Sequence, residues 1–273
     1  MLSTNNSGPG LKLLAVPWCS VTALQDEQTC GREVAEETPL ALEYGGLPYA
    51  VMMGTPADLE DFAIGFSITE GIIRQIDDIR ALDYAPHNDG IRICLTLRAH
   101  ALHRFLSRRR VRALRGHTGC GVCGAEDLQQ VDALPLPSVG AGPTARPALG
   151  GVLQRLRDAQ PLSRRTHGAH AAAWVSNAGI PLLVREDVGR HNALDKLIGA
   201  ALRSGQDLRA GFCLITSRCS FEMVQKTLAA GISTLVAVSA PTAFAIRTAR
   251  SAGLTLLTLD RSGHEITYAA PTR

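Results

Sequence analysis

The sequence predicts an α/β protein whose C-terminal half is a mostly parallel β-sheet covered by helices on both faces. Three short runs in this half are almost entirely apolar and have the length of strands: residues 212–216, 234–238 and 254–259. Two stretches with apolar residues at helical spacing, 221–230 and 243–252, separate these runs. Strands that are apolar along their whole length and alternate with helices are typical of a parallel sheet that is buried on both faces.

A hairpin and a helix come before these strands and make the predicted sheet mixed. Residues 171–175 and 180–184 have strand character and flank the turn sequence Asn177-Ala178-Gly179. A helix follows, with its apolar residues at positions 194, 197, 198, 201 and 202. We therefore place the C-terminal domain at residues 161–273.

The N-terminal part of the chain predicts a smaller α+β subdomain over residues 34–134. Residues 37–44 and 47–53 are strand-like and are joined by a Gly-Gly turn. A helix is expected to begin after them, with Thr55 as its N-cap and Pro56 at its first position.

Two further segments lie outside these domains. Residues 1–33 show little periodicity and are predicted to be a tail or an edge element. Residues 135–160 are rich in proline and glycine and are predicted to be a linker or a mobile loop.

The composition argues against several classes of protein. The 273 residues carry a formal net charge of only +3, which gives no reason to expect nucleic-acid binding. The chain has neither an apolar run of roughly 18 residues, as a membrane span needs, nor a secretory signal at its start, so we expect a cytoplasmic protein. Its seven cysteines are an odd number and indicate thiols rather than a disulfide framework.

Polar loops follow the predicted strands of the C-terminal sheet. In sheets of this kind ligands bind beyond the carboxyl ends of the strands. Hydroxyl groups, glycines, arginines and helix N-termini gathered at one edge would bind phosphate or a nucleotide. We expect Arg190, Arg218 and Arg261 to pair with phosphate, because a planar guanidinium can donate two hydrogen bonds to it. His191 and Asn192 are expected to orient the ligand.

The pair Cys120-Gly121-Val122-Cys123 is the candidate for covalent chemistry. Residues 98–117, just before it, include seven arginines and three histidines and no acidic residue. Nearby arginine and histidine side chains lower the pKa of a thiol and favour its thiolate. A thiolate attacks a donor persulfide by the chemistry of disulfide exchange and then carries the sulfane sulfur. The sequence thus predicts sulfur carriage, with Cys120 as the nucleophile.

The spacing of the cysteine pair also allows other uses. Zinc would use His117 with both cysteines, but a structural site needs a fourth ligand and no second Cys/His cluster exists, so we expect no metal. A thioredoxin-like dithiol would follow an early strand, whereas this pair lies in the middle of the chain. A zinc deaminase would need a preceding His-x-Glu, which the chain lacks. A buried, inert pair is the remaining alternative.

Several segments carry a family resemblance, and they occur in the same order along the chain. The longest reads Glu186-Asp187-Val188-Gly189-Arg190-His191-Asn192-Ala193-Leu194-Asp195-Lys196. The others are residues 54–66 and 70–73, the segment 120–124 around the cysteine pair, and residues 166–172 and 217–226. Together they resemble the FdhD-type formate dehydrogenase accessory sulfurtransferases.

This resemblance implies a specific reaction. Sulfur from a cysteine desulfurase would be held as a persulfide on Cys120, with Cys123 as the accessory cysteine. It would then pass to the bis-molybdopterin guanine dinucleotide cofactor (Mo-bisMGD) that formate dehydrogenase uses. The resemblance also implies a homodimer and a cytidine-deaminase-like, three-layer C-terminal sandwich. A cofactor-binding chaperone that carries no sulfur is the alternative from a different class.

The loop that contacts the guanine dinucleotide in this family falls after the last of the three apolar strands. GDP would be an analogue of that part of the cofactor. The loop comprises six residues: Leu259, Asp260, Arg261, Ser262, Gly263 and His264. This loop departs from the family's more basic, glycine-rich form at Asp260, Ser262 and His264. His167 is a further departure, since glycine is usual there.

Overall fold

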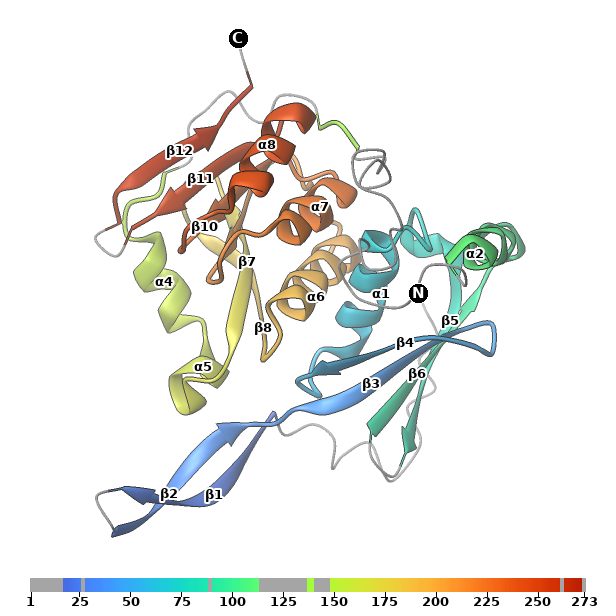
Figure 1. Cartoon of the computed structure of the whole chain (residues 1–273), viewed down its shortest axis with the longest axis horizontal. Coiled ribbons are helices and arrows are strands. Elements are labelled where there is room, and N and C mark those ends of the chain that lie inside the picture. The colour runs from blue at the N-terminus through green and yellow to red at the C-terminus, as the bar shows by residue number, and fades with distance from the viewer. Residues whose placement is uncertain are drawn as a thin grey trace.

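The computed structural model describes residues 17–25, 28–87, 90–112, 137–139, 148–260 and 263–271. Figure 1 shows a C-terminal α/β body, a smaller four-stranded sheet beside it, and a two-stranded hairpin that projects from both. The functional argument depends mainly on the first two parts and on the contact between them.

Six strands form the C-terminal sheet in the order β12-β11-β10-β9-β7-β8. The parallel strands are β9, β10 and β11, and β7 pairs antiparallel with both β9 and β8, so β8 runs in the same direction as β9. β12 pairs antiparallel with β11. The predicted mixed sheet, with most strands in one direction, is confirmed. The bounds are β7 (His170–Ser176), β8 (Pro181–Asp187), β9 (Gly211–Ile215), β10 (Thr234–Ala237), β11 (Thr255–Leu259) and β12 (Glu265–Ala269).

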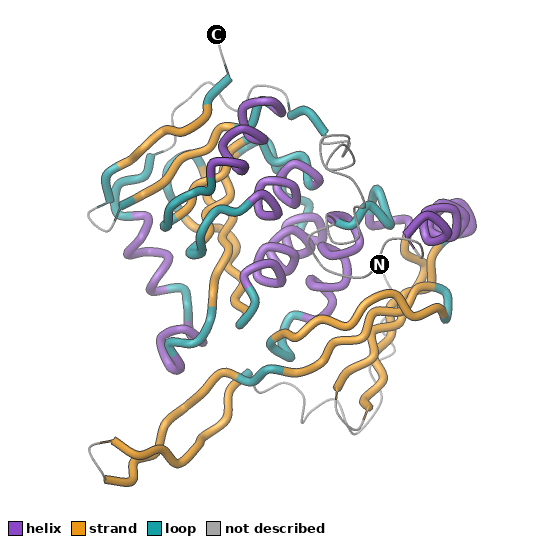
Figure 2. Tube along the Cα trace, in the orientation of Figure 1, coloured by secondary structure: helices purple, strands orange, loops and turns teal. Residues whose placement is uncertain are grey.

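Helices cover both faces of this sheet. Figures 1 and 2 show α6 (Arg190–Arg203), α7 (Phe221–Ala229) and α8 (Ala243–Ala252) together on one face. Alternate strand residues such as Trp174 and Cys213 pack toward these three helices. The other face packs Ala173 and Phe212 against α4 (Val152–Asp158), and α5 (Pro161–Thr166) leads into β7. The predicted α/β class is therefore confirmed, while the narrower cytidine-deaminase-like topology stays a prediction.

The N-terminal subdomain is a four-stranded sheet in the order β4-β3-β6-β5 with helices packed on one face. Its first two strands form the hairpin predicted around Gly45 and Gly46, both of which have positive φ. The bounds are β3 (Thr38–Tyr44), β4 (Leu47–Gly54), α1 (Leu59–Thr69), β5 (Ile79–His87), β6 (Gly90–Leu97) and α2 (Ala99–Arg112), with a short 3-10 turn at Ile76–Asp78.

The two parts meet where α1 crosses α6, and glycines on both helices permit the close approach. A Cβ added at Gly65 would lie 1.8 Å from the carbonyl oxygen of Asp195, and one at Gly199 would lie 1.9 Å from that of Asp61. Neither position can therefore carry a side chain while the helices stay where they are. A single apolar core, which includes Ile64 of α1, runs through both parts.

Two segments differ from the outline drawn from the sequence. The projecting hairpin pairs β1 (Trp18–Gln25) with β2 (Gln28–Ala35), so the predicted boundary after residue 33 falls inside a strand. Arg165 of α5 holds the base of this hairpin, because its guanidinium pairs with Glu33 and lies 4.1 Å from the ring centre of Trp18. The predicted linker at residues 135–160 contains α4, which packs on the C-terminal sheet.

Candidate functional site

One edge of the C-terminal sheet collects the C-terminal ends of β8, β9, β10 and β11 and the N-terminal end of β7. We call this edge the rim, and define it as residues 170, 187–192, 216–220, 239–242 and 260. The N-termini of α6, α7 and α8 lie there, because each helix follows a strand that ends at the rim. Neighbouring strands are about 4.8 Å apart, so the four steps from β11 to β8 extend over about 19 Å.

The β7–β8 end of the rim gathers basic side chains. His170 begins β7 directly opposite Asp187, the last residue of β8, and Arg190 and His191 begin α6 three residues later. Burial lowers the pKa of His170, and the positive charges of Arg190 and His191 lower it further. The imidazole of His170 is consequently neutral at neutral pH.

His191 lies against Glu222 of the neighbouring helix. Its Nε2 lies 2.5 Å from Oε2 of Glu222 in the first turn of α7, and both side chains are partly exposed. The contact with His191 holds the pKa of Glu222 below its ordinary value, against the opposing effect of burial. One turn further along both helices, Lys226 Nζ lies 2.8 Å from Asp195 Oδ2. The two pairs fix the N-terminus of α7 beside that of α6.

Asn192 lies beneath the rim rather than on its surface. Its side chain is only 2% exposed, and its amide nitrogen donates to the carbonyl oxygen of Met53 at 2.7 Å and to Asp187 at 3.1 Å. The structure thus gives Asn192 contacts within the fold, and its predicted contact with a ligand stays a prediction. Arg218, in contrast, is exposed in the loop between β9 and α7.

The loops that follow β9 and β10 are joined to each other. The backbone N–H of Cys219 donates to the carbonyl of Ala240, and Cys219 in turn accepts from the N–H of Thr242 at 3.0 Å. The Thr242 hydroxyl caps α8 by accepting from the N–H of Ala245. The loop that carries Arg218 is therefore held on both sides, by α6 through Glu222 and by the β10–α8 loop.

The predicted guanine dinucleotide loop forms a turn between β11 and β12. Asp260 closes it, since its carboxylate accepts from the N–H of His264 at 2.8 Å and lies 3.2 Å from the His264 ring nitrogen Nδ1. Gly263 has a positive φ, as such a turn requires. Leu259 is 1% exposed and packs in the core, whereas Arg261 and Ser262 lie outside the described residues. The sheet order puts this turn two strands from the end of β9.

The predicted reactive pair, Cys120 and Cys123, also lies outside the described residues. Among the described cysteines, Cys213 and Cys219 are buried, and burial raises the pKa of both thiols, that of Cys219 to about 12. These two are therefore poor nucleophiles. No cluster of three or more metal-binding side chains occurs in the part of the chain that the structure describes.

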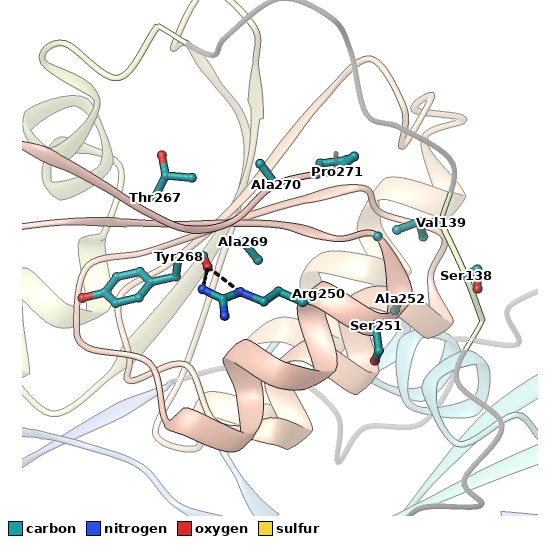
Figure 3. Close-up of a pocket in the computed structure, with 11 residues that line it drawn as sticks. Ser138, Val139, Arg250, Ser251, Ala252, Thr267, Tyr268, Ala269, Ala270 and Pro271 are labelled. Atoms are coloured by element: carbon teal, nitrogen blue, oxygen red, sulfur yellow. Dashed lines mark hydrogen bonds between the residues drawn. The ribbon is translucent and has the colours of Figure 1, made fainter. Parts of the chain in front are cut away.

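A separate groove lies at the opposite edge of the sheet. Its lining comes from Ser138 and Val139, the end of α8 and the end of β12 (Figure 3). Arg250 reaches across it, and its guanidinium donates to the carbonyl oxygen of Tyr268 at 3.0 Å and 3.2 Å. Because α8 begins at the rim and ends at this groove, the length of the helix separates the two.

Within the described ranges, no helix is both long and apolar enough to span a membrane.

The fold and the rim define a mixed α/β protein with arginine and histidine side chains gathered at the C-terminal ends of its parallel strands. A model of the FdhD/NarQ family matches residues 35–273, and the chain belongs to that family. A sulfur carrier protein FdhD from Cupriavidus necator is 48% identical over 241 residues, which cover 88% of this chain and 83% of the relative. Another from Bordetella petrii is also 48% identical and covers 88% and 86%. The resemblance drawn from the sequence motifs is thereby confirmed.

A solved structure shares the fold. It is a crystal structure of a protein from Desulfotalea psychrophila described as a formate dehydrogenase accessory protein, with a TM-score of 0.68 and 23% sequence identity. The match covers 93% of this chain and 96% of that protein. The two subdomains and their arrangement are therefore not peculiar to this sequence.

Sequence reasoning placed Arg190, His191 and Arg218 at the rim but missed three residues that shape it. His170 lies in a motif segment, yet nothing in its spacing marks it as a neighbour of Arg190. Glu222 could have been found from spacing. His191 and Asp195 lie four residues apart, as do Glu222 and Lys226, so each predicted helix carries a basic and an acidic residue on one face, as two helices that pair with each other would. The prediction that Thr55 caps the first helix is wrong, because α1 begins at Leu59 with Asp58 at its N-cap position. Thr55 instead contacts Asp187, which only the folded chain brings close to it.

Proposed function

We propose that this protein accepts sulfane sulfur from a cysteine desulfurase as a persulfide on Cys120 and delivers it to Mo-bisMGD for formate dehydrogenase. The observation that carries the proposal is the rim, where Arg190 and His191 begin α6 beside His170 and where the N-termini of α7 and α8 also lie. The names of the relatives, sulfur carrier protein and formate dehydrogenase accessory protein, support the assignment to sulfur transfer.

The rim suits an extended anionic ligand. Helix N-termini carry partial positive charge and unpaired N–H groups, and arginine adds charge-assisted hydrogen bonds to phosphate. An edge of about 19 Å is long enough for a dinucleotide-bearing cofactor to lie along several strands. We place the guanine end at the turn after β11 and the phosphates toward Arg218 and Arg190.

The sulfur step is a thiol exchange at Cys120. The thiolate attacks the terminal sulfur of the desulfurase persulfide, a new S–S bond forms on Cys120, and the desulfurase cysteine leaves as its thiolate. No external oxidant or reductant is needed, because the sulfane sulfur moves between two thiols. Cys123 would assist at this step. We also expect a homodimer that works in the cytoplasm.

Mass spectrometry tests the sulfur step directly. After incubation with a cysteine desulfurase and cysteine, the intact protein should gain one sulfur, and the gain should vanish in Cys120→Ala. Cys19→Ala is the matched control, because Cys19 is an exposed thiol and its loss should leave the added sulfur in place. Absence of added sulfur on a protein that still binds GDP would instead favour the chaperone that carries no sulfur.

Calorimetry with GDP tests the rim. Arg190→Ala should weaken GDP binding by about tenfold, since hydrogen bonds to charged groups are the stronger class. Arg209→Ala serves as the control, because this side chain is 84% exposed and follows α6 at the end remote from the rim. Equal GDP affinity in the two variants would contradict the placement of phosphate beside Arg190.

A further inference from the structure

The rim loop at residues 187–192 is attached to the N-terminal subdomain at the end of β4, where Asn192 donates to the carbonyl oxygen of Met53 and Thr55 contacts Asp187 and Val188. Thr55, just after β4, is fully buried and uses all three of its polar groups on the C-terminal domain. Its N–H donates to Asp187 Oδ2 at 3.0 Å, and its hydroxyl accepts from the N–H of Val188 at 3.1 Å. Its carbonyl accepts from Lys196 Nζ at 2.9 Å. Figure 1 shows the end of β4 reaching the end of β8 at this place.

Asp187 connects Thr55 to the rest of the rim loop through its hydrogen bonds. Besides Thr55, its carboxylate accepts from Lys196 Nζ at 2.6 Å, from the N–H of Gly189 at 2.7 Å and from Asn192 at 3.1 Å. A carboxylate offers about four acceptor positions, so these donors leave no capacity for a ligand. Asp187 therefore acts on the rim through Gly189 and Asn192, which flank the two basic residues at the start of α6.

The end of β4 packs closely against the rim loop. A Cβ added at Gly54 would lie 2.8 Å from the amide nitrogen of Asn192 and 3.3 Å from Asp187 Oδ2. Residues 53–55 are therefore packed closely against Asp187 and Asn192, the two ends of the loop whose backbone carries Arg190 and His191.

Stability alone is a weak reason for this arrangement. Asp187 and Lys196 are both 0% exposed, and taking two charges out of water offsets much of their mutual attraction. Apolar packing would join the two parts as firmly. What the polar contacts add is a fixed direction for each donor and acceptor, and hence a fixed position for the loop.

We propose that Thr55 is a positioning residue for the phosphate-binding part of the rim, through its hydroxyl bond to Val188 and its N–H bond to Asp187. The N-terminal subdomain, whose predicted range includes Cys120, thereby sets the geometry of the site that holds the sulfur acceptor. This inference rests on the proposed nucleotide site at the rim.

Three threonine variants test it, with GDP affinity measured by calorimetry and unfolding measured by urea titration. Thr55→Val keeps the backbone contacts but loses the hydroxyl, and should weaken GDP binding by about three- to tenfold. Thr55→Ser keeps the hydroxyl and should bind GDP within about twofold of the wild type. Thr227→Val is the control, because Thr227 is equally buried and its hydroxyl bonds only to Met223 in its own helix.

The outcomes separate the two proposals. If Thr55→Val and Thr227→Val both lose stability but both bind GDP like the wild type, the role of Thr55 is structural and the inference is wrong. If the wild-type protein itself fails to bind GDP, the nucleotide site fails and the inference fails with it. Weaker binding in Thr55→Val alone, restored in Thr55→Ser, is the expected result.

Discussion

Replacing Lys196 by methionine should destabilise the protein strongly, because it leaves the buried charge of Asp187 without its cation. The two side chains are both fully buried and their charged atoms are 2.6 Å apart. Methionine follows the shape of the lysine stem, so lost packing contributes little. Removing one partner of a buried pair destabilises by about 3–5 kcal/mol. Asp187 keeps three hydrogen-bond donors, so we expect the lower end, about 3 kcal/mol.

Urea unfolding at neutral pH measures this loss. For a slope of about 3 kcal/mol/M, a loss of about 3 kcal/mol moves the midpoint down by about 1 M. Circular dichroism and tryptophan fluorescence must give coincident transitions for the free energy to be defined. The double variant with Asp187→Asn should lose less than the sum of the single losses, because the second change removes the charge that the first left unpaired.

The control is Arg209→Met, whose partner Asp207 is 54% exposed, and an exposed pair contributes about 0–1 kcal/mol. A midpoint for Lys196→Met as close to wild type as that of Arg209→Met would refute the reasoning. So would strictly additive losses in the double variant, since they would mean that the two charges do not interact.

Two further predictions concern the ion pair at the rim and the helix crossing. Glu222→Gln should lower the melting temperature more at about pH 6 than at about pH 3. The contact with His191 holds the folded pKa of Glu222 below its ordinary value of 4.5, so the stability that the contact contributes is present above pH 4.5 and is lost as the pH falls through the folded pKa. An equal difference at both pH values would contradict this assignment. Gly65→Ala should cost about 3 kcal/mol or more in urea unfolding, because its Cβ would overlap the carbonyl of Asp195, whereas Gly31→Ala, with open space around it, should cost less than about 1 kcal/mol. Equal losses in the two glycine variants would show that α1 and α6 can move apart freely.

The strands of the C-terminal sheet could be predicted because a strand buried on both faces has an almost uninterrupted run of apolar residues. Phe212 and Val236 stand in runs with almost no polar residue, and such runs have few alternative structures. The hairpin at residues 18–35 has no such apolar run, because polar and apolar residues are mixed along both strands. One of its contacts is to Arg165, which is far away in the sequence. The helix α4 was not predicted, because it is short and follows a segment rich in proline and glycine.

The candidate site was predictable only where a residue and its role share one segment. Arg190 and His191 sit between a strand and a helix, so their place at the sheet edge follows from the order of elements. The contacts that hold them there do not follow, because Thr55 is 132 residues from Asp187 and meets it only after both parts have folded. Sequence spacing reports neighbours within an element, whereas these contacts depend on how the elements pack.

The glycine crossing of α1 and α6 bears on how the protein can move. With the backbone of one helix filling the space where the other would carry a side chain, the two parts cannot separate without exposing a shared apolar core. We therefore expect no hinge motion between them, and we expect neither part to fold alone when the chain is cut between residues 134 and 161. We therefore expect the sheet that bears the rim and the sheet that bears β4 to keep a fixed relative position, so that any molecule bound along the rim contacts a surface of fixed shape.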